Sequence, residues 1–163
     1  MNLTVTSLAL TAFAIASFSV AEAKPNVQLS LIGNVVEHQA GGADRLTPLS
    51  TSNPIESGKL IRYTVVAKNS GNEPARNLMP MGKIPSGTSY ELKSSTSDVI
   101  NSKVEFSIDN GKTWAVKPMV LVHTSQGNVQ KMAESTMYTA IRWNDKSLPA
   151  NAKATFSYEV RVK

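Results

Sequence analysis

Hydrophobic and polar residues alternate with a period of two along most of the chain, and the clearest stretch is residues 153–163. Its odd positions are mostly charged or hydroxylated, whereas its even positions are apolar or aromatic: Ala154, Phe156, Tyr158, Val160 and Val162. Such alternation is typical of an antiparallel strand with one buried face and one solvated face. Residues 61–68 and 137–144 alternate in the same way, and their expected inward positions are Ile61, Tyr63, Val65 and Ala67, and Met137, Thr139, Ile141 and Trp143.

Shorter β-favouring runs fill much of the remaining chain and are separated by turn residues. Turns rich in Gly, Pro, Ser and Asn are expected at residues 69–72, 85–87 and 148–151. Strands of this length and spacing predict an all-β protein, specifically an antiparallel β-sandwich of about seven to nine strands. The further strands are expected near residues 27–36, 75–79, 88–94, 104–108, 113–116 and 119–122.

Two connections are longer than a turn requires. Residues 38–57 are rich in Gly, Ser, Thr and Pro, and we expect either a disordered excursion or a binding loop there. Residues 124–135 are polar, and the spacing of Val129, Met132 and Ala133 is compatible with one helical turn. The composition of neither connection indicates a particular ligand.

The N-terminus has the pattern of a secretory signal peptide. Residues 3–20 are apolar apart from Ser and Thr, and Ala21 and Ala23 are the small residues of an A-x-A cleavage site before Lys24. An uncleaved anchor is the alternative, because the segment approaches the ~20 residues that span a bilayer. The cleavage site and the hydroxyl residues favour removal. The sequence therefore predicts a signal peptide at 1–23 and one domain at 24–163, extracytoplasmic (periplasm, cell surface or secreted) and with no stable membrane span after cleavage.

The absence of cysteine excludes disulfides, thiol catalysis, zinc–thiolate sites and a lipid-carrying cysteine. A domain of roughly 140 residues can fold without disulfides, because it buries roughly two-thirds of its unfolded surface. The formal net charge is +5, and the Lys and Arg residues are spread evenly rather than clustered. Nucleic-acid binding would require a basic patch with stacking aromatics, so we expect no nucleic-acid partner. Attraction to anionic wall polymers stays open.

Residues 107–114 match the octapeptide S-x-D-x-G-x-T-W, which is called an Asp-box. Asn-Gly between two β-favouring runs predicts a tight hairpin turn with positive φ, in which the aspartate accepts hydrogen bonds from turn N–H groups. Sialidases carry this box, but they need a much longer propeller with repeated boxes, an arginine cluster and a tyrosine nucleophile. We therefore expect a structural hairpin, with the tryptophan packed on its apolar side, from Ser107, Asp109, Asn110, Gly111, Thr113 and Trp114.

Catalytic chemistry has little support in the sequence. His38 and His123 are the two histidines, and each is expected to be an ordinary loop or strand-end residue. No nucleophile-elbow, Walker or H-E-x-x-H motif occurs, although a triad assembled from scattered residues stays open. Asp98 and Asp109 near strand ends leave a calcium site as an alternative. We predict no catalytic, metal-binding or cofactor-binding residue and no enzymatic activity.

Aromatic side chains are the remaining functional lead. If several share one open face, they can stack on sugar rings or anchor a protein partner. The favoured alternative is that most of them belong to the core, as is usual in β-sandwiches. The residues concerned are Tyr63, Tyr90, Trp114, Tyr138, Trp143 and Tyr158.

The order of the turns resembles a known family. Residues 58–71 have the sequence G-K-L-I-R-Y-T-V-V-A-K-N-S-G, followed by P-A-R-N-L at 74–78 and I-P-S-G-T-S-Y at 84–90. With the Asp-box, I-R-W at 141–143, L-P at 148–149 and the alternating strand, this series is similar to the bacterial conserved repeat domain catalogued as domain of unknown function eleven.

The resemblance covers Gly58 to Val162 and has two departures. The family usually has an aspartate shortly before its I-P-x-G turn, where this chain has M-G-K at 81–83, and a Pro-Gly where this chain has Pro149-Ala150. The resemblance implies an immunoglobulin-like sandwich of bacterial envelope or surface proteins, with no assigned catalysis.

Three non-enzymatic functions are consistent with these observations. The leading hypothesis is an exported module with a structural, adhesion or interaction role in the envelope, whose partner is an unidentified protein or an envelope glycan. A carbohydrate-binding module is the second. A pilin-like subunit is the third, because Val27, Leu29 and Leu31 can form a donated strand; pairing of that strand within its own chain would argue against it. A sialidase or another hydrolase is the least favoured.

Overall fold

A computed structural model describes residues 23–50, 52 and 54–163, and their main elements are antiparallel β-strands. The protein is therefore all-β, as the period-two pattern predicts. One short 3₁₀ turn, η1 (Ser135–Met137), interrupts the series. In chain order the strands are β1 (Val27–Glu37), β2 (Arg45–Pro48), β3 (Leu60–Asn69), β4 (Ala75–Leu78), β5 (Met81–Lys83), β6 (Thr88–Tyr90), β7 (Thr96–Ser97), β8 (Lys103–Ser107), β9 (Met119–Thr124), β10 (Gly127–Met132), β11 (Ala140–Leu148) and β12 (Lys153–Val162).

The first sheet has the order β2-β1-β3-β12-β6, and β7 pairs with β12 beside β6. Its long central pair is β3 with β12, which runs in register from Lys68 opposite Lys153 to Leu60 opposite Arg161. β1 pairs with the other edge of β3 along nearly its whole length. The first predicted strand is thus part of its own chain's sheet, which is the observation that argues against a donated strand.

The second sheet is built around β11, with β4 and β5 along one side and β8 along the other. β4 and β5 keep a single register, because Leu78 lies opposite Asp145 and Met81 lies opposite Arg142. The strand is interrupted at Pro80, whose nitrogen has no hydrogen to donate. Its carbonyl still accepts a hydrogen bond from the Trp143 backbone N–H at 3.0 Å.

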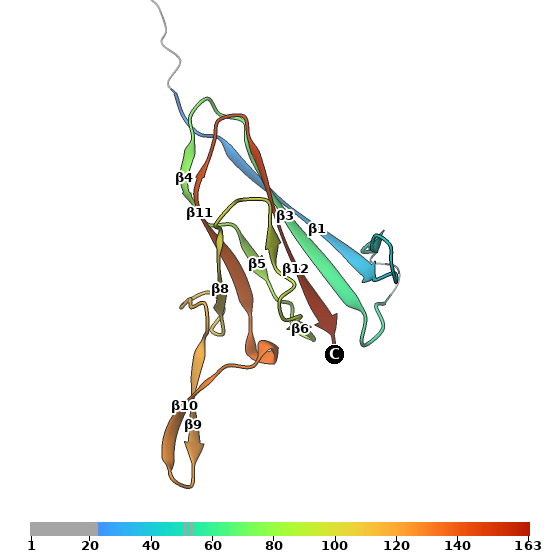
Figure 1. Cartoon of the computed structure of the whole chain (residues 1–163), viewed down its shortest axis with the longest axis vertical. Helices are drawn as coiled ribbons and strands as arrows, with labels where there is room; N and C mark the ends of the chain where they lie inside the picture. Colours follow the sequence, from blue (N-terminus) through green and yellow to red (C-terminus); the bar gives the residue numbers. More distant parts are fainter. Residues whose placement is uncertain (1–22, 51, 53) are drawn as a thin grey trace, which may run out of the picture.

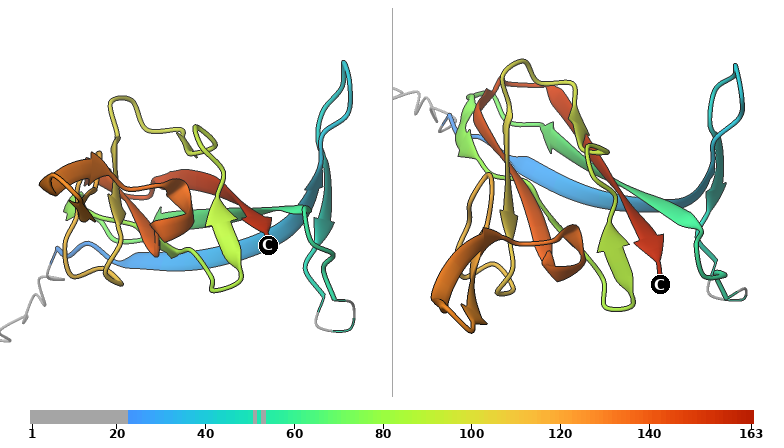
Figure 2. Two further views of the ribbon diagram at one scale, coloured as in Figure 1. Left: turned by 90° about the horizontal axis from the view of Figure 1, so that it is seen from below. Right: turned by 60° about the horizontal axis from the view of Figure 1, so that its bottom comes forward.

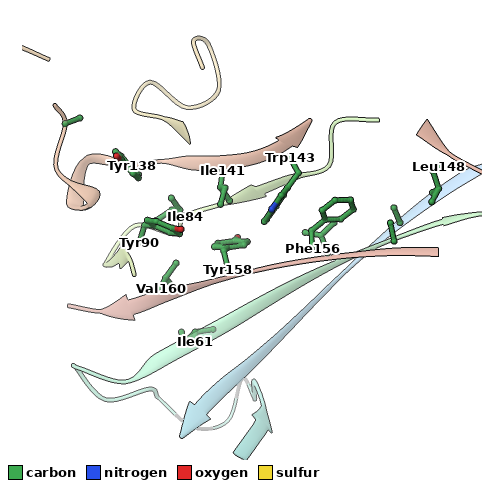
Figure 3. Packing of buried hydrophobic residues seen from close by; sticks show 14 of the residues in the cluster. Ile61, Ile84, Tyr90, Tyr138, Ile141, Trp143, Leu148, Phe156, Tyr158 and Val160 are labelled. Atoms are coloured by element: carbon green, nitrogen blue, oxygen red, sulfur yellow. The ribbon is translucent and has the colours of Figure 1, made fainter. Parts of the chain in front are cut away.

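The core lies between these two sheets (Figure 3). Ile141 and Trp143 from β11 meet Phe156 and Tyr158 from β12, with the Trp143 ring centroid 5.4 Å from that of Phe156 and 5.9 Å from that of Tyr158. The Tyr158 hydroxyl donates a 2.5 Å hydrogen bond to the Lys83 carbonyl in the facing sheet. Of the inward positions predicted for this strand, Ala154, Phe156, Tyr158 and Val160 are buried, whereas Val162 at its end is only partly buried.

The order of the strands differs from that of an immunoglobulin domain. An immunoglobulin constant domain, with strands named A to G in chain order, has one sheet A-B-E-D and another C-F-G. Here the corresponding strands are β1, β3, β4 with β5, β6 with β7, β8, β11 and β12, if β2, β9 and β10 are set aside. Counted in this way, the first sheet has the order first-second-seventh-fourth (β1-β3-β12-β6). The second sheet has the order third-sixth-fifth (β4 with β5, β11, β8). The fifth and seventh strands have exchanged places relative to the immunoglobulin order.

A buried asparagine joins three segments at one end of the two sheets. The Asn69 side-chain amide donates to the carbonyls of Glu73 at 2.8 Å, Leu148 at 3.2 Å and Pro149 at 3.1 Å. Its side-chain oxygen accepts from the backbone N–H groups of Asn26 at 3.0 Å and Gly71 at 3.1 Å. The start of β1, the β3–β4 turn and the β11–β12 turn are therefore held by one side chain.

Several sequence-based boundaries are wrong. Residues 113–116 form no strand, because Ala115 makes only an isolated bridge with Phe106. The strand expected at 88–94 ends at Tyr90, since a turn follows in which Lys93 has a φ of 65°. The strand expected at 137–144 begins only at Ala140, after η1.

The two long connections also differ from expectation. Within 38–57, β2 pairs with the end of β1. In place of a loop with a helical turn at 124–135, β10 pairs with β9 from Met132 opposite Met119 to Gly127 opposite Thr124. Thr124 and Gly127 flank the tight turn: Gly127 has a φ of 114°, and the Thr124 hydroxyl donates to the Gly127 carbonyl at 2.7 Å. The helical turn occurs later, as η1.

The pair β9–β10 projects from the body as a separate two-stranded arm (Figure 1). Figure 2 places this arm and the β1–β2 hairpin at opposite sides of the molecule. The N-terminal end of β1 lies at the end of the molecule opposite the arm (Figure 1), and the first described residue, Ala23, is exposed. Ala21 and the rest of the predicted signal peptide up to residue 22 lie outside the described residues. In the described part of the chain, no helix has the length and apolar character needed to cross a membrane.

Candidate functional site

A groove of about 700 Å³ lies between the edge of the first sheet and the edge of the second. One wall is formed by β6 and the turn that follows it, and the other by β8 and the segment leading to the arm. Most of the lining is apolar. Beside three aromatic rings, the apolar side chains are Leu92, Val104, Val116 and Met132.

Three aromatic rings from distant parts of the chain form the floor of the groove. The Phe106 ring centroid lies 4.9 Å from that of Tyr90 and 4.7 Å from that of Tyr138. Tyr90 is 4% exposed and Tyr138 is 8% exposed, so these two rings are used mainly in packing against one another and Phe106. Burial, reinforced by the nearby Tyr90, raises the pKa of Tyr138 further above physiological pH.

The polar part of the lining is basic. Lys93, Lys103 and Lys117 surround the apolar floor, and Ser95 is the fourth polar contributor. No aspartate or glutamate belongs to the lining among the described residues. A ligand in the groove therefore meets positive charge at the rim and hydrocarbon at the floor.

The edge of β8 that faces away from β11 is only partly occupied. Phe106 exchanges two backbone hydrogen bonds with Ala115, of 2.8 Å and 3.0 Å. In an antiparallel ladder, alternate residues direct their N–H and C=O groups to the same side. Val104 therefore also points its backbone groups outward, but the facing chain has turned away at Val116 and Lys117. Within the described residues the outer ladder consists of this one bridge.

The arm begins at the groove. Met132 lines the groove, and Met119 lies opposite Met132 in the β9–β10 ladder, so the two side chains share one face of the arm. Leu121 lies two residues further along the same face. All three side chains are exposed, and they extend the apolar surface from the groove onto the arm.

The Asp-box residues form a compact turn at the end of β8. The Asp109 carboxylate accepts from the Ser107 hydroxyl at 2.7 Å, the Thr113 backbone N–H at 2.9 Å and the Thr113 hydroxyl at 2.6 Å. These bonds, first of all that from the Thr113 side chain, lower the pKa of Asp109 to about 2. Asn110 and Gly111 have φ values of 59° and 88°, which are the positive values that the Asn-Gly pair requires.

This turn is wider than a two-residue hairpin. The flanking bridge joins Phe106 and Ala115, and the whole octapeptide lies between them. The reason is that the Asp109 side chain binds Thr113, which draws the chain into a loop before it can pair. The Trp114 indole N–H donates to the Gly111 carbonyl at 3.0 Å, and the Arg142 guanidinium lies 4.6 Å from the Trp114 ring centroid.

Trp114 therefore does not line the groove. Arg142 lies opposite Glu105 in the ladder and binds its carboxylate at 2.7 Å. Because neighbouring residues of a strand point to opposite faces, Glu105 lies on the outer face while Phe106 points to the core and groove. The Asp-box tryptophan packs on the outer face of the second sheet through Arg142.

A charged cluster on the first sheet contains His38. Its Nδ1 lies 2.7 Å from the Asp44 carboxylate, and its Nε2 lies 3.7 Å from Glu159. Arg62 donates to both Asp44 and Glu159, which explains how Glu159 is buried on the polar face of β12. Hydrogen bonds from His38 and Arg62 lower the pKa of Asp44. The His38 ring contacts the carboxylates of Asp44 and Glu159 and not a serine, so these contacts do not form the arrangement of a Ser-His-Asp site.

The other candidate ligands lie apart from the groove lining. His123 is exposed near the tip of the arm, and the Asp98 carboxylate accepts from the Thr155 backbone N–H at 2.8 Å. No group of three or more His, Asp or Glu side chains suited to a metal ion occurs among the described residues.

Sequence reasoning did not identify the groove. The sequence presents Tyr90 and Tyr138 only as aromatics of either the core or the surface, and Phe106 only as part of the β-favouring run at 104–108. The three residues are separated by turns whose paths decide whether they meet, so no local signal could have revealed the site. Comparisons with known protein families, with curated proteins and with solved structures found no match for this chain.

Proposed function

We propose that this protein is a non-enzymatic, exported envelope module that binds a partner through the groove between β6 and β8. The module is immunoglobulin-like in the broad sense of two packed antiparallel sheets, with the exchanged strand order described above. The observation that carries the proposal is the groove itself, because a concave apolar surface with a few polar groups at its rim is typical of a binding site. Its lining has no histidine or carboxylate among the described residues that would provide acid–base chemistry.

A protein partner is favoured over a sugar. Sugar binding by aromatic residues usually requires an accessible ring face. Tyr90 and Tyr138 are almost fully buried, and the ring of Trp114 is covered by Arg142 on one side. Exposed aliphatic side chains such as Leu92 and Val116 instead suit contacts with apolar side chains of a protein.

Binding to envelope material tests the proposal. We would label the protein with a fluorophore and measure its sedimentation with wall and membrane fractions of the producing cell. Val116→Glu places a charge in the groove, whereas Ile100→Glu places the same charge at a residue outside the groove lining. Both side chains are exposed, Val116 at 59% and Ile100 at 87%, so neither change should disturb the core.

The expected result is that Val116→Glu lowers binding and Ile100→Glu leaves it unchanged. Equal binding of both variants and the parent protein would contradict a role for the groove. Loss of binding on competition with purified wall glycans, but not with envelope proteins, would select the carbohydrate-binding alternative. Export is tested separately by mass spectrometry of the extracytoplasmic fraction, where the proposal predicts a new N-terminus at Lys24 and not an intact Met1.

A further inference from the structure

We infer that the groove binds an extended, acidic peptide segment of a partner protein, which pairs as an added strand with the outward edge of β8 at Val104. This inference rests on the proposed function, because it assigns a ligand class to the same groove. It depends on three independent properties of the site: an unfilled position in a β-ladder, an apolar floor and a basic rim.

The ladder supplies the first argument. Phe106 already pairs outward with Ala115, and Val104 directs its backbone groups to the same side of β8. Continued pairing would bring Lys117 opposite Val104, but Pro118 follows and the chain departs toward the arm. An incoming strand can take the position that Lys117 leaves free and can pair with the outward N–H and C=O groups of Val104.

The floor supplies the second argument. A strand beside β8 turns every second side chain toward one face of the sheet. On that face lie Phe106, Tyr90 and Tyr138, which are stacked into a single apolar surface. A volume of about 700 Å³ is that of a site for a small ligand or a few side chains, so a short segment is expected and not a whole domain surface.

The rim supplies the third argument and fixes the charge of the ligand. Lys93, Lys103 and Lys117 approach the groove from three different segments, with no acidic side chain among the described lining residues. Complementary charge speeds association and selects partners, while like charge opposes binding. Carboxylates flanking the apolar residues of the peptide therefore improve binding, and lysines at those positions weaken it.

Peptide titrations can test each argument separately. The probe is a synthetic peptide of about nine residues, blocked at both ends, with alternating valine and threonine around a phenylalanine and glutamates at its ends. A second peptide replaces the glutamates by lysines, and a third carries N-methyl groups at alternate residues of the acidic peptide. Binding is followed by amide chemical-shift changes in the 15N-labelled protein.

The acidic peptide is expected to bind roughly tenfold more tightly than the basic one, with shifts centred on Val104 and Phe106. N-methylation of the edge that faces β8 removes its donors and is expected to weaken binding by a similar factor. The double variant Lys103→Glu/Lys117→Glu should reverse the charge preference. The control Lys146→Glu/Lys153→Glu changes the net charge equally at exposed residues outside the lining and should keep it.

Val104→Pro distinguishes a strand from an anionic polysaccharide. The Val104 nitrogen faces outward, so proline removes the donor without breaking the ladder with β11. Peptide binding should be lost, whereas a polysaccharide held by the lysines would still bind. Equal binding of acidic and basic peptides, or no shift near Val104 at millimolar concentrations, would overturn the inference. If Val116→Glu still abolishes envelope binding in that case, the proposed function holds and only the ligand class is wrong.

Discussion

Replacing Asn69 by aspartate should strongly destabilise the fold, although the two side chains have almost the same shape. Asn69 is fully buried and makes five hydrogen bonds of 2.8 to 3.2 Å. Aspartate can keep the two bonds in which the side-chain oxygen accepts. It replaces the NH₂ group, however, by an oxygen that faces the carbonyls of Glu73, Leu148 and Pro149.

The magnitude follows from those three carbonyls. A buried polar group that loses its partner costs about 1–3 kcal/mol, and a buried charge without a counterion costs more. We expect Asn69→Asp to lower the free energy of unfolding by about 3–5 kcal/mol at pH 7. Urea denaturation followed by the fluorescence of the buried Trp143 measures this loss. Asn144→Asp, at an exposed position of β11, adds the same charge and should change stability by less than about 0.5 kcal/mol.

The pH dependence provides a second check on the same reasoning. The carbonyl oxygens favour a protonated acid at position 69, so its pKa in the folded state is raised above its unfolded value. The penalty is then complete above the folded pKa and becomes smaller as the pH falls below it. A loss of stability equal to that of Asn144→Asp, or one that is the same at pH 7 and pH 4, would refute the account of the Asn69 bonds.

Three further predictions concern the fold and the Asp-box. Gly82→Ala would place a Cβ atom 2.4 Å from Cε1 of the buried Tyr158 and should cost about 1–3 kcal/mol in urea denaturation; Gly42→Ala, with its nearest atom at 3.7 Å, is the control, and an equal effect of the two would contradict the close approach. Asp109 has a pKa lowered to about 2, so its contribution to the stability of the fold is present above pH 4 and disappears as the pH falls toward 2. The Asp109→Asn variant should lose this part of the pH dependence of stability, measured by NMR during an acid titration. An unchanged pH dependence in the variant would contradict this role of Asp109. Gly111→Ala forces a φ of 88° on a residue with a side chain and should cost roughly 1–2 kcal/mol without altering envelope binding, whereas loss of binding in a folded variant would indicate a functional role for the box.

The period-two pattern predicts most of the buried face of β3, β11 and β12, because the other sheet covers one side of these strands. Phe156 and Tyr158 on β12 and Trp143 on β11 are buried as expected. The pattern fails just before β11: Met137 is expected to point inward but is exposed, and Tyr138 is expected to point outward but is buried, because regular strand geometry begins only at Ala140. Alternation is informative only where a strand continues.

The arm shows a second limit of the sequence. β10 is exposed along its whole length, so no buried face imposes an alternating pattern on its residues. The turn before it is made by Ser125 and Gln126 between Thr124 and Gly127, without the Asn-Gly pair that signals a hairpin. The spacing of Val129 and Met132 therefore suggested a helical turn where a strand is present.

The groove and the hydrogen bonds of Asn69 could not be predicted for a different reason. Asn69 was recognised as part of a turn, but its partners near residues 26 and 148 are far away in the sequence. The order of the strands decides such contacts. No pattern within a single strand encodes it.

The place of β12 in the first sheet has a consequence for how the chain folds. β12 lies between β3 and β6, yet it is synthesised long after both of them. Until residues 153–162 are available, β3 has an open edge and the inner face of the core lacks Phe156, Tyr158 and Val160. A partial chain can pair β1 with β2 and β3 but lacks this part of the core, so we expect the packed two-sheet structure to form only when nearly the whole sequence is available. In the proposed route of export, this delay would keep the chain extended during passage through a narrow channel, and the same open edge would make it dependent on protection from aggregation until β12 arrives.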